Sequence, residues 1–331
     1  MSTTLNLLSD STFGDKLDEQ NAILEDIRDN ISGGGGSFPY IAMTVDEYLA
    51  ITPQANKAYW VYNAGYEHGV YLNGNCVEGK DVAVTNPWVA IQNLVRAGTF
   101  ANTYSVGDQF TVKFNNVDTA WDIVAIDVAT PADSNLSHSV TLMPHDCLDA
   151  LMFDNAEPNN PNSDRKSYGN NRYKESNIRL YLNSSGAAGT WWSSQGTYDA
   201  APDYATTKAG FMSNFESDFL EVIGKTKIRV AKNTVTDGGS YEDLSDEYFY
   251  LASETEVGLG NENNIAEGST FPYFSDNNRR IKNYQGSAKW WWLRTPDASY
   301  SRYVRSVDTG GSLDGYDAYG ATGLAAACNI I

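Results

Sequence analysis

The C-terminal end of the chain holds two short apolar stretches with a polar, aromatic segment between them. The stretches are residues 290–293 (WWWL) and 324–330 (LAAACNI), and short apolar runs of this kind are typical of buried strands. Sixteen of the 24 residues from 297 to 320 are instead Tyr, Ser, Gly or Asp. The chain must therefore fold so that both stretches are buried while the segment between them reaches the surface.

The composition of residues 297–320 is typical of a binding surface. Tyr offers a large amphipathic contact area with only two torsions to fix, while Ser and Gly adapt and form hydrogen bonds. Arg302 and Arg305 add anchors of the type found at binding hot spots. An ordinary surface hairpin is the alternative, because Gly, Ser and Asp also favour turns. The predicted ligand-binding residues are Asp297, Ser299, Tyr300, Ser301, Arg302, Tyr303, Arg305, Ser306, Asp308, Ser312, Asp314, Tyr316, Asp317 and Tyr319.

The charge of the chain argues against two classes of partner. Of 331 residues, 23 are Lys or Arg and 42 are Asp or Glu, which gives a formal net charge of −19. Nucleic acids and anionic membranes are bound through clustered Lys and Arg, so we expect neither as a partner. No run of ~18 apolar residues is present, and we expect no membrane insertion. The N-terminus has no basic start followed by an apolar stretch, so we expect no secretory signal.

Residues suited to catalysis or metal binding are scarce. The chain has three cysteines and three histidines, and no C-x-x-C spacing indicates a disulfide framework or a zinc ribbon. His145 and Cys147 form an H-x-C without the further ligands that zinc requires, so the cysteines are expected to be buried thiols. No carboxylate pair stands out among the 42 acidic residues, and no G-x-S-x-G is present. The sequence therefore predicts no catalytic residue, no metal site, no cofactor and no enzymatic activity.

Composition divides the chain into three parts. Residues 1–37 hold a helical pattern between Asp15 and Ile31, with apolar residues at heptad-like spacing, followed by a glycine-rich flexible linker. So short a helix is marginal alone, so we expect it to bundle with other copies of the chain or to dock on a larger assembly. Residues 38–104 predict a small α+β module, and residues 105–331 predict a larger domain with Gly- and Asn-rich loops.

Local patterns place several elements within these parts. Thr44 and Glu47 form a capping box that predicts a helix, and Ser253 and Glu256 form another. Asn86 caps a further helix that ends at Gly98. Strands are predicted at residues 58–62, 69–72, 110–114, 121–128, 139–143 and 227–231, and helices at residues 175–182 and 215–223.

The larger domain resembles a bacterial and phage domain family of otherwise unknown function. That family is marked by W-W-L-R-[ST]-P, a variable stretch and then G-[LV]-x-[PA]-A-x-N-[IL], which resemble Trp291–Pro296 and Gly323–Ile330. NIRLYLN at Asn177–Asn183 and DEYFYLASETEVG at Asp246–Gly258 resemble family segments in the same order, and FNNVDTAWDIVAIDV resembles its opening hairpin. The resemblance covers roughly residues 105–331.

The resemblance implies an α+β chain whose C-terminal domain is a variant of the C-type lectin fold, related to sulfatase-modifying (formylglycine-generating) domains. Variable proteins of diversity-generating retroelements use this fold, phage tropism determinants among them. Ala325–Ala327 stand where the family has arginine and proline, and the paired cysteines of formylglycine-generating enzymes have no counterpart, so that activity is not implied. Glu157-Pro158-Asn159 matches a sugar-binding calcium triplet of C-type lectins, but the Trp-Asn-Asp strand that should accompany it is missing.

The function implied by the resemblance is that of a phage- or prophage-encoded receptor-binding or adhesin-like protein. Residues 297–320 would present a variable surface to a protein or glycan of a host cell. Adenine-directed mutagenesis of Asn-type codons would yield Tyr, Ser, Asp and Gly, and the segment contains no Asn. We expect a location in the virion, for example in a tail fibre, with the N-terminal helix contacting other virion proteins or forming a homo-oligomer, preferably a trimer.

Three alternatives remain open at this point. The chain could reside in the bacterial cytoplasm rather than in a virion. It could be an enzyme that acts on envelope polysaccharide, or a structural component of a virion or cell envelope without a variable ligand.

Overall fold

The computed structural model describes residues 40–44, 50–52, 58–62, 68–72, 75–79 and 86–331. The chain divides into two compact units, Met1–Asn93 and Leu94–Ile331. The predicted N-terminal helix, the glycine-rich linker and the helix predicted after Thr44 lie outside the described residues. Among the residues that the structure describes, no helix has both the length and the apolar character needed to cross a lipid bilayer.

The first unit contains a four-stranded sheet with the order β1-β2-β3-β4. Its strands are β1 (Tyr40–Thr44), β2 (Ala58–Tyr62), β3 (His68–Leu72) and β4 (Asn75–Gly79). β1 and β2 are parallel, whereas the other neighbours are antiparallel. The strands predicted at residues 58–62 and 69–72 are therefore confirmed.

Helix α3 (Pro87–Arg96) begins and ends as the sequence predicts. The backbone amide of Trp88 donates to Asn86 Oδ1 at 2.9 Å, so the Asn86 side chain satisfies an amide that the first helical turn leaves unpaired. Gly98 has φ +66°, and the amide of Thr99 donates to the carbonyl of Leu94 at 3.0 Å. Glycine adopts this left-handed conformation without steric cost, which closes the helix at the predicted residue.

The residues that follow α3 belong to the second unit. Phe100 is buried, stacks on Tyr104 with 4.9 Å between ring centroids, and lies 6.4 Å from the ring of Phe110 on β5 (Gln109–Phe114). The sequence places the boundary near residue 104 instead, because composition alone does not show this aromatic packing.

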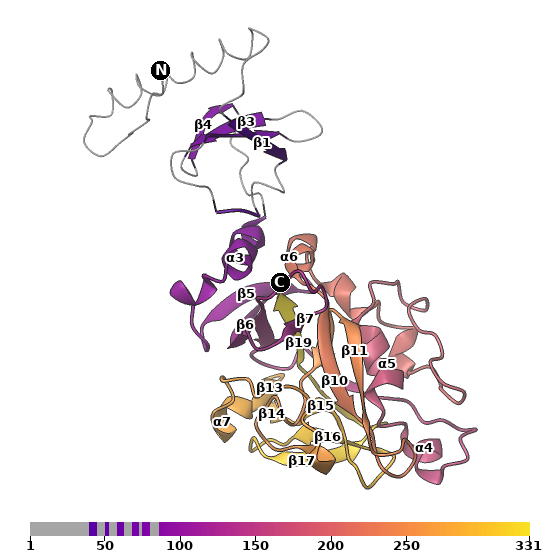
Figure 1. Cartoon of the computed structure of the whole chain (residues 1–331). Helices are drawn as coiled ribbons and strands as arrows, with labels where there is room; N and C mark the ends of the chain where they lie inside the picture. The colour runs from indigo at the N-terminus through magenta and orange to yellow at the C-terminus, as the bar shows by residue number, and fades with distance from the viewer. Residues whose placement is uncertain (1–39, 45–49, 53–57, 63–67, 73–74, 80–85) are drawn as a thin grey trace, which may run out of the picture. The chain divides into compact units, whose positions relative to one another are not determined.

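The second unit is built on two five-stranded sheets (Figure 1). The first has the order β12-β19-β8-β6-β5 and is antiparallel throughout. The second has the order β17-β16-β15-β18-β9, in which β15 and β18 are parallel. Two smaller sheets have the orders β11-β10-β7 and β13-β14. The strands beyond β5 are β6 (Val117–Ile126), β7 (Thr130–Pro131), β8 (Val140–Pro144), β9 (Asp149–Met152), β10 (Thr226–Ala231), β11 (Tyr241–Glu247), β12 (Phe249–Leu251), β13 (Lys282–Tyr284), β14 (Ser287–Lys289), β15 (Trp291–Pro296), β16 (Tyr303–Val307), β17 (Leu313–Asp317), β18 (Ala321–Leu324) and β19 (Ala326–Ile330).

Short helices connect these strands, so the described residues form a mixed α+β structure dominated by β-sheet. The α-helices are α4 (Ser163–Tyr168), α5 (Asn177–Leu182), α6 (Ser217–Val222) and α7 (Asn277–Arg280). The 3-10 turns are η1 (Phe100–Asn102), η2 (Tyr173–Glu175), η3 (Asp203–Ala205), η4 (Phe211–Asn214) and η5 (Glu262–Asn264). The strands predicted at 110–114, 121–128, 139–143 and 227–231 and the helices predicted at 175–182 and 215–223 correspond to β5, β6, β8, β10, α5 and α6.

Apart from the half-buried Trp290, the two apolar stretches at the C-terminus are buried, as the sequence predicts. Every residue of β15 and of β19 is buried. The indole Nε1 of Trp291 donates to the carbonyl of Arg280, and that of Trp292 donates to the carbonyl of Leu151, both at 2.8 Å. A buried indole needs such an acceptor, so these bonds fix the strand from which residues 297–320 continue.

Arg294 on β15 is fully buried and ties this strand to three other parts of the chain. Its guanidinium donates to both carboxylate oxygens of Glu256, at 2.6 and 2.8 Å. Glu256 is itself held by the reciprocal bonds of a capping box, because the amides of Ser253 and Glu256 each donate to the other's side chain at 3.0 Å. A turn follows Ser253, however, and not the helix that this pattern predicts. Three backbone carbonyls also accept from the guanidinium: those of Leu251, Glu267 and Arg229. The arginine of the W-W-L-R pattern is therefore a structural residue.

Candidate ligand-binding surface

Residues 297–320 contain the hairpin of β16 and β17, which follows the buried strand β15 in the chain, precedes β18 and forms one edge of the sheet. β16 pairs with β15 on one side and with β17 on the other. In the hairpin Tyr303 is opposite Asp317 and Val304 is opposite Tyr316. Because β15 precedes the segment and β18 follows it, the backbone is held at both ends and along one edge. A rigid frame of this kind can present side chains without a large loss of conformational entropy on binding.

Three of the four tyrosines of the segment are exposed to solvent. Tyr300, Tyr316 and Tyr319 expose 47%, 45% and 47% of their surface. Tyr303 is half-buried and packs edge-on against Tyr300, with 5.0 Å between ring centroids. The other exposed residues of the predicted set are Ser299, Ser312 and Asp314. Cross-strand partners share a face of the sheet, so Tyr316 and Tyr303 lie on opposite faces of the hairpin.

Arg302 is the centre of an aromatic cluster on the Tyr303 face. Its guanidinium lies over the rings of Tyr168 and Tyr303, at 4.5 and 4.6 Å from the centroids, and donates to the Tyr303 hydroxyl at 2.8 Å. The amide of Tyr319 donates to the carbonyl of Tyr168 at 2.8 Å. We call Arg302, the rings of Tyr168, Tyr303 and Tyr300, and Tyr319, whose backbone is bonded to that of Tyr168, the Arg302 cluster. It combines two of the three residue types most enriched at binding hot spots.

Two carboxylates orient Arg302 within this cluster. Its Nε lies 3.1 Å from Asp317 Oδ1, and its Nη1 lies 3.4 Å from Asp164 Oδ1. Both ion pairs are partly exposed, so each contributes orientation more than stability. The guanidinium is thus held in place against two rings, while Tyr168, Tyr300 and Tyr319 remain exposed to solvent.

Three residues of the predicted set are buried, which corrects their expected position at the surface. Asp297 is nearly inaccessible, and Ser301 and Ser306 are completely so. Ser301 Oγ donates to Asn162 Oδ1 at 2.8 Å, an oxygen that also caps the start of α4. Ser306 lies on the inner strand of the hairpin, between β15 and β17. These side chains contact the interior of the protein and are not available to a ligand at the surface.

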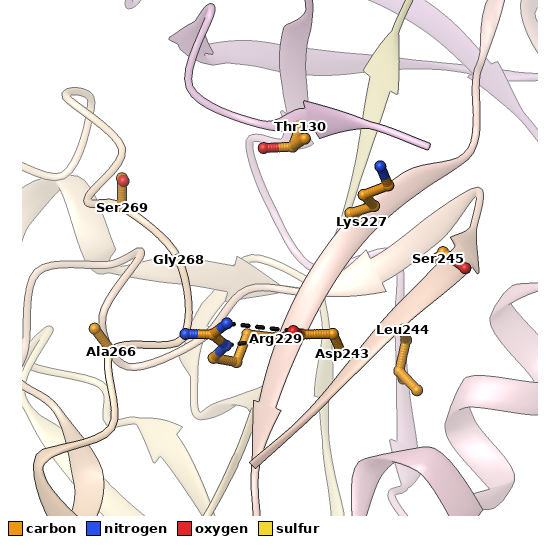
Figure 2. Close-up of a pocket in the computed structure, with 9 residues that line it drawn as sticks. All are labelled: Thr130, Lys227, Arg229, Asp243, Leu244, Ser245, Ala266, Gly268 and Ser269. Carbon is orange, nitrogen blue, oxygen red and sulfur yellow. Dashed lines mark hydrogen bonds and ion pairs between the residues drawn. The ribbon is translucent and has the colours of Figure 1, made fainter. Parts of the chain in front are cut away.

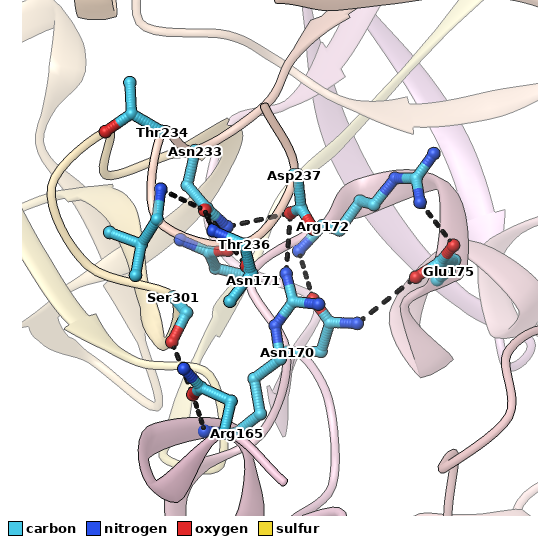
Figure 3. Close-up of polar contacts among 12 residues, drawn as sticks. Arg165, Asn170, Asn171, Arg172, Glu175, Asn233, Thr234, Thr236, Asp237 and Ser301 are labelled. Carbon is cyan, nitrogen blue, oxygen red and sulfur yellow. Dashed lines mark hydrogen bonds and ion pairs between the residues drawn. The ribbon is translucent and has the colours of Figure 1, made fainter. Parts of the chain in front are cut away.

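Asn171 fixes the loop that carries Tyr300. Its side-chain amide donates to the carbonyls of Tyr300 and Tyr303 at 2.8 and 2.9 Å, and its backbone amide donates to the carbonyl of Ser301 at 3.2 Å. Figure 3 shows how three further side chains extend this network: Asn233, Asp237 and Arg165. Hydrogen bonds are stronger in the interior than in water, so a fully paired network of this kind restricts the loop to one conformation.

Arg305 is fixed by carboxylates and does not offer a free cation. Its Nη2 lies 2.6 Å from Glu262 Oε2, and its Nη1 lies 3.2 Å from Asp297 Oδ2. Glu262 also accepts from the amide of Ala298 at 3.0 Å. Nearby, burial and then the charge of Glu262 raise the pKa of Glu254 to about 7. Arg305 therefore clamps the loop before the hairpin, and its role as a binding anchor stays a prediction.

Asp308 holds the turn between the two strands of the hairpin. Its Oδ1 accepts from the amides of Gly310 and Ser312, both at 2.8 Å. Gly311 has φ +80°, and a Cβ at this position would lie 2.1 Å from the carbonyl oxygen of Asn277. Only glycine fits so close to the neighbouring backbone, so this turn is also fixed.

Residues 139–331 match the family described as Domain of unknown function (DUF6273). The chain belongs to this family. No curated protein and no solved structure matches the chain. The match begins at Ser139, directly before β8, so the DUF6273 domain contains the hairpin and the whole Arg302 cluster, whereas β5 and β6 precede it.

Tyr168 belongs to the Arg302 cluster but is not among the ligand-binding residues that the sequence predicts. It exposes 40% of its surface at the end of α4, far from residues 297–320 in the chain. Nothing in its local sequence distinguishes it from other exposed tyrosines. Its place in the cluster depends on the tertiary contact with Arg302.

The opposite face of the hairpin holds a small cleft of about 250 Å³ beside Tyr316. The ring of Tyr316 packs against Trp290 and Trp292, with centroid distances of 5.9 and 6.3 Å. Trp290 is the only half-buried member of the Trp290–Trp292 triplet, since Trp291 and Trp292 are fully buried. The triplet therefore contributes mainly to the core.

Glu157 of the calcium-triplet match and the two cysteines of the DUF6273 domain lie inside the fold. Glu157 is buried and accepts from the side-chain amides of Asn160 and Asn170, and burial raises its pKa. Within the described ranges, no group of three or more His, Cys, Asp and Glu side chains is arranged to hold a metal ion. Cys147 and Cys328 are buried free thiols as predicted, and burial raises the pKa of Cys147 to about 12.

Proposed function

We propose that the DUF6273 domain of this chain is a recognition module that binds its ligand through the Arg302 cluster. The observation that carries this proposal is the placement of Tyr168, Tyr300 and Tyr319. All three rings are exposed, yet their backbones are fixed by buried or paired groups. Exposed aromatic rings on a rigid frame bury large areas on binding and lose little entropy.

The biological role that we propose is that of a phage- or prophage-encoded receptor-binding or adhesin-like protein. Its ligand would be a protein or glycan on the surface of a host cell. The N-terminal part would join the chain to other virion proteins or to its own copies, preferably as a trimer. Several copies on one particle would raise the overall strength of attachment well above that of a single site.

The resemblance of Trp291–Pro296 and Gly323–Ile330 to the signature described above supports a finer proposal about fold and origin. We propose that the domain is a variant of the C-type lectin fold and that residues 297–320 are the target of a diversity-generating retroelement. The locus should then carry a near-identical, adenine-rich copy of this segment beside a reverse transcriptase gene. A locus with neither feature would contradict the retroelement origin and leave a fixed binding surface.

A cell-binding assay tests the proposed surface directly. The full chain is labelled with a fluorophore and incubated with a panel of intact bacterial strains, and the cell-associated fluorescence is titrated. We expect saturable binding to at least one strain. The triple variant Tyr168→Ala, Tyr300→Ala, Tyr319→Ala should bind that strain at least a hundredfold more weakly, because each lost hot-spot ring typically costs 2 kcal/mol or more.

A second triple variant controls for the loss of exposed apolar surface in general. Val117→Ala, Tyr198→Ala and Val235→Ala remove three exposed apolar side chains that lie outside the cluster. This variant should bind as the unaltered chain does, and both variants should keep the same thermal unfolding midpoint. Equal binding by the two triple variants, or binding to no strain at all, would contradict the proposal.

A further inference from the structure

A second concave site lies on the three-stranded sheet, away from residues 297–320. The sheet formed by β11, β10 and β7 and the loop 266–269 enclose a groove of about 610 Å³ (Figure 2). A groove of this size matches the range that small-ligand sites occupy. Nine residues line it and define what we call the β10 groove: Thr130, Lys227, Arg229, Asp243, Leu244, Ser245, Ala266, Gly268 and Ser269.

Two cations face the β10 groove from a single strand. Thr226, Ile228 and Val230 are buried, so the alternation of β10 directs the intervening Lys227 and Arg229 outward. Lys227 is exposed, and its ammonium has no hydrogen-bond or ion-pair partner in the described part of the chain. The groove thus carries two positive charges against the one negative charge of Asp243, in a chain whose net charge is −19. A locally positive site in an acidic protein attracts an anionic ligand.

Arg229 is pre-oriented in this groove. Its Nε and Nη2 donate to the two carboxylate oxygens of Asp243 at 2.8 and 3.2 Å, as Figure 2 shows. Its guanidinium also lies over the ring of Tyr241, 3.9 Å from the centroid. Its Nη1 forms no hydrogen bond within the described residues and remains free to donate. An arginine fixed in this way loses little conformational entropy when it binds an anion.

The rest of the groove wall is rich in neutral polar groups. The hydroxyls of Thr130, Ser245 and Ser269 belong to exposed residues on three different segments. Gly268 has φ +115°, and a Cβ there would lie 2.7 Å from Glu256 Oε1, so glycine lets the loop lie close against the Glu256 side chain. As far as the described residues go, the groove therefore offers an unpaired ammonium, a fixed guanidinium, a carboxylate and several hydroxyls around a single space.

We propose that the β10 groove binds a carboxylate-bearing sugar, such as a hexuronic acid unit of a glycan. Lys227 and Arg229 would hold the sugar carboxylate, while the Asp243 carboxylate and the hydroxyls of Thr130, Ser245 and Ser269 would exchange hydrogen bonds with the ring hydroxyls. A carboxylate is an acceptor that sugar hydroxyls can share. The same carboxylate repels any anion, but it repels a phosphate with up to two negative charges more strongly than the single charge of a hexuronate, and a phosphate has no ring hydroxyls to offer in return. The proposal does not depend on the Arg302 cluster.

Titration of the full chain with D-glucuronate, followed by ligand-observed NMR, tests this site. We expect saturable binding that weakens with rising salt. Lys227→Gln should weaken it at least tenfold. Lys232→Gln is the matched control, because Lys232 follows β10 but does not line the groove, and it should leave binding unchanged. Both lysines are partly or fully exposed, and circular dichroism spectra should show the same fold for both variants.

Titrations with glucose, acetate and inorganic phosphate separate the parts of the proposal. Glucose lacks the carboxylate, and acetate and phosphate lack the ring hydroxyls, so all three should bind at least tenfold more weakly than glucuronate. Equal binding of acetate or phosphate would overturn the sugar site in favour of an unspecific anion site. Absence of glucuronate binding, or binding unaffected by Lys227→Gln, would also overturn it. The Tyr168, Tyr300 and Tyr319 triple variant should still bind glucuronate, so this result is separate from that of the cell-binding assay.

Discussion

Replacing Glu256 by Gln would show how strongly the buried ion pair stabilises the second unit. The substitution keeps the shape of the side chain and removes the negative charge opposite the fully buried Arg294 guanidinium. Removal of one partner from a buried pair costs about 3–5 kcal/mol, because the other charge stays buried without compensation. Three backbone carbonyls would still accept from Arg294, so we expect a loss near the lower end, about 3 kcal/mol of unfolding free energy.

Asp243→Asn provides the matched control. Asp243 holds Arg229 through the same two-oxygen geometry, but the side chains of this pair are 59% and 39% exposed. Exposed ion pairs contribute about 0–1 kcal/mol, since water solvates both charges when the pair breaks. Both variants therefore lose the same type of ion pair, but the pair is buried in one case and exposed in the other.

Urea unfolding followed by tryptophan fluorescence measures both losses. Trp291 and Trp292 are fully buried on the same strand as Arg294, so their emission reports unfolding of the region that the pair holds. We expect a large decrease of the midpoint for Glu256→Gln at an unchanged dependence on urea, and a small decrease for Asp243→Asn. Losses below ~1 kcal/mol in both variants would refute the reasoning, because the interior would then tolerate the arginine without its partner.

Two further predictions follow from burial in the same unit. Burial raises the pKa of Glu267 from its usual 4.5 to about 7, so the folded state binds this proton more tightly than the unfolded state does. The stability contribution is complete below about pH 4.5 and is lost as pH rises through about 7, by up to ~3 kcal/mol. Glu267→Gln should reduce the decline in urea titrations between pH 4.5 and 8 by this amount and leave the part that comes from other buried carboxyls such as Glu254. An undiminished decline in the variant would contradict the assignment. Ser301→Tyr should cost about 3 kcal/mol because Ser301 is fully buried, whereas Ser299→Tyr at an exposed site should cost less than ~0.5 kcal/mol. Thermal unfolding of the two variants checks this, and equal midpoints would contradict the burial of Ser301.

Local patterns predict much of the secondary structure, because the forces that set it act over a few residues. The Asn86 cap and the Gly98 terminus of α3 depend on neighbouring backbone groups, and both are found where the sequence places them. The buried strands β15 and β19 follow from short apolar runs that have no other stable location. The division between the two units is harder to predict, because it depends on the packing of Phe100 against residues further along the chain.

The candidate surface is less predictable because a polar residue can satisfy its hydrogen bonds with water or with the protein. Ser299 and Ser301 are two residues apart and chemically identical, yet one is exposed and the other is buried against Asn162. Arg302 and Arg305 likewise look equivalent in the sequence. Their difference comes from Tyr168, which stacks on Arg302, and from Glu262, which pairs with Arg305. Such partners lie far away in the chain and are set only by the tertiary fold.

This separation of exposed from buried positions limits which residues of the segment can vary. Side chains at Tyr300, Tyr316 and Tyr319 can change with little effect on the interior, because nearly half of the surface of each residue is exposed. New side chains at Ser301 or Ser306 would instead enter space that is already filled, and overpacking a closed interior commonly costs 1–3 kcal/mol. If a retroelement diversifies this segment, the gene should therefore differ from the template copy mainly at the codons of the exposed residues. A template that differs equally often at the codons of Ser301 and Ser306 would contradict the position of these two residues inside the domain.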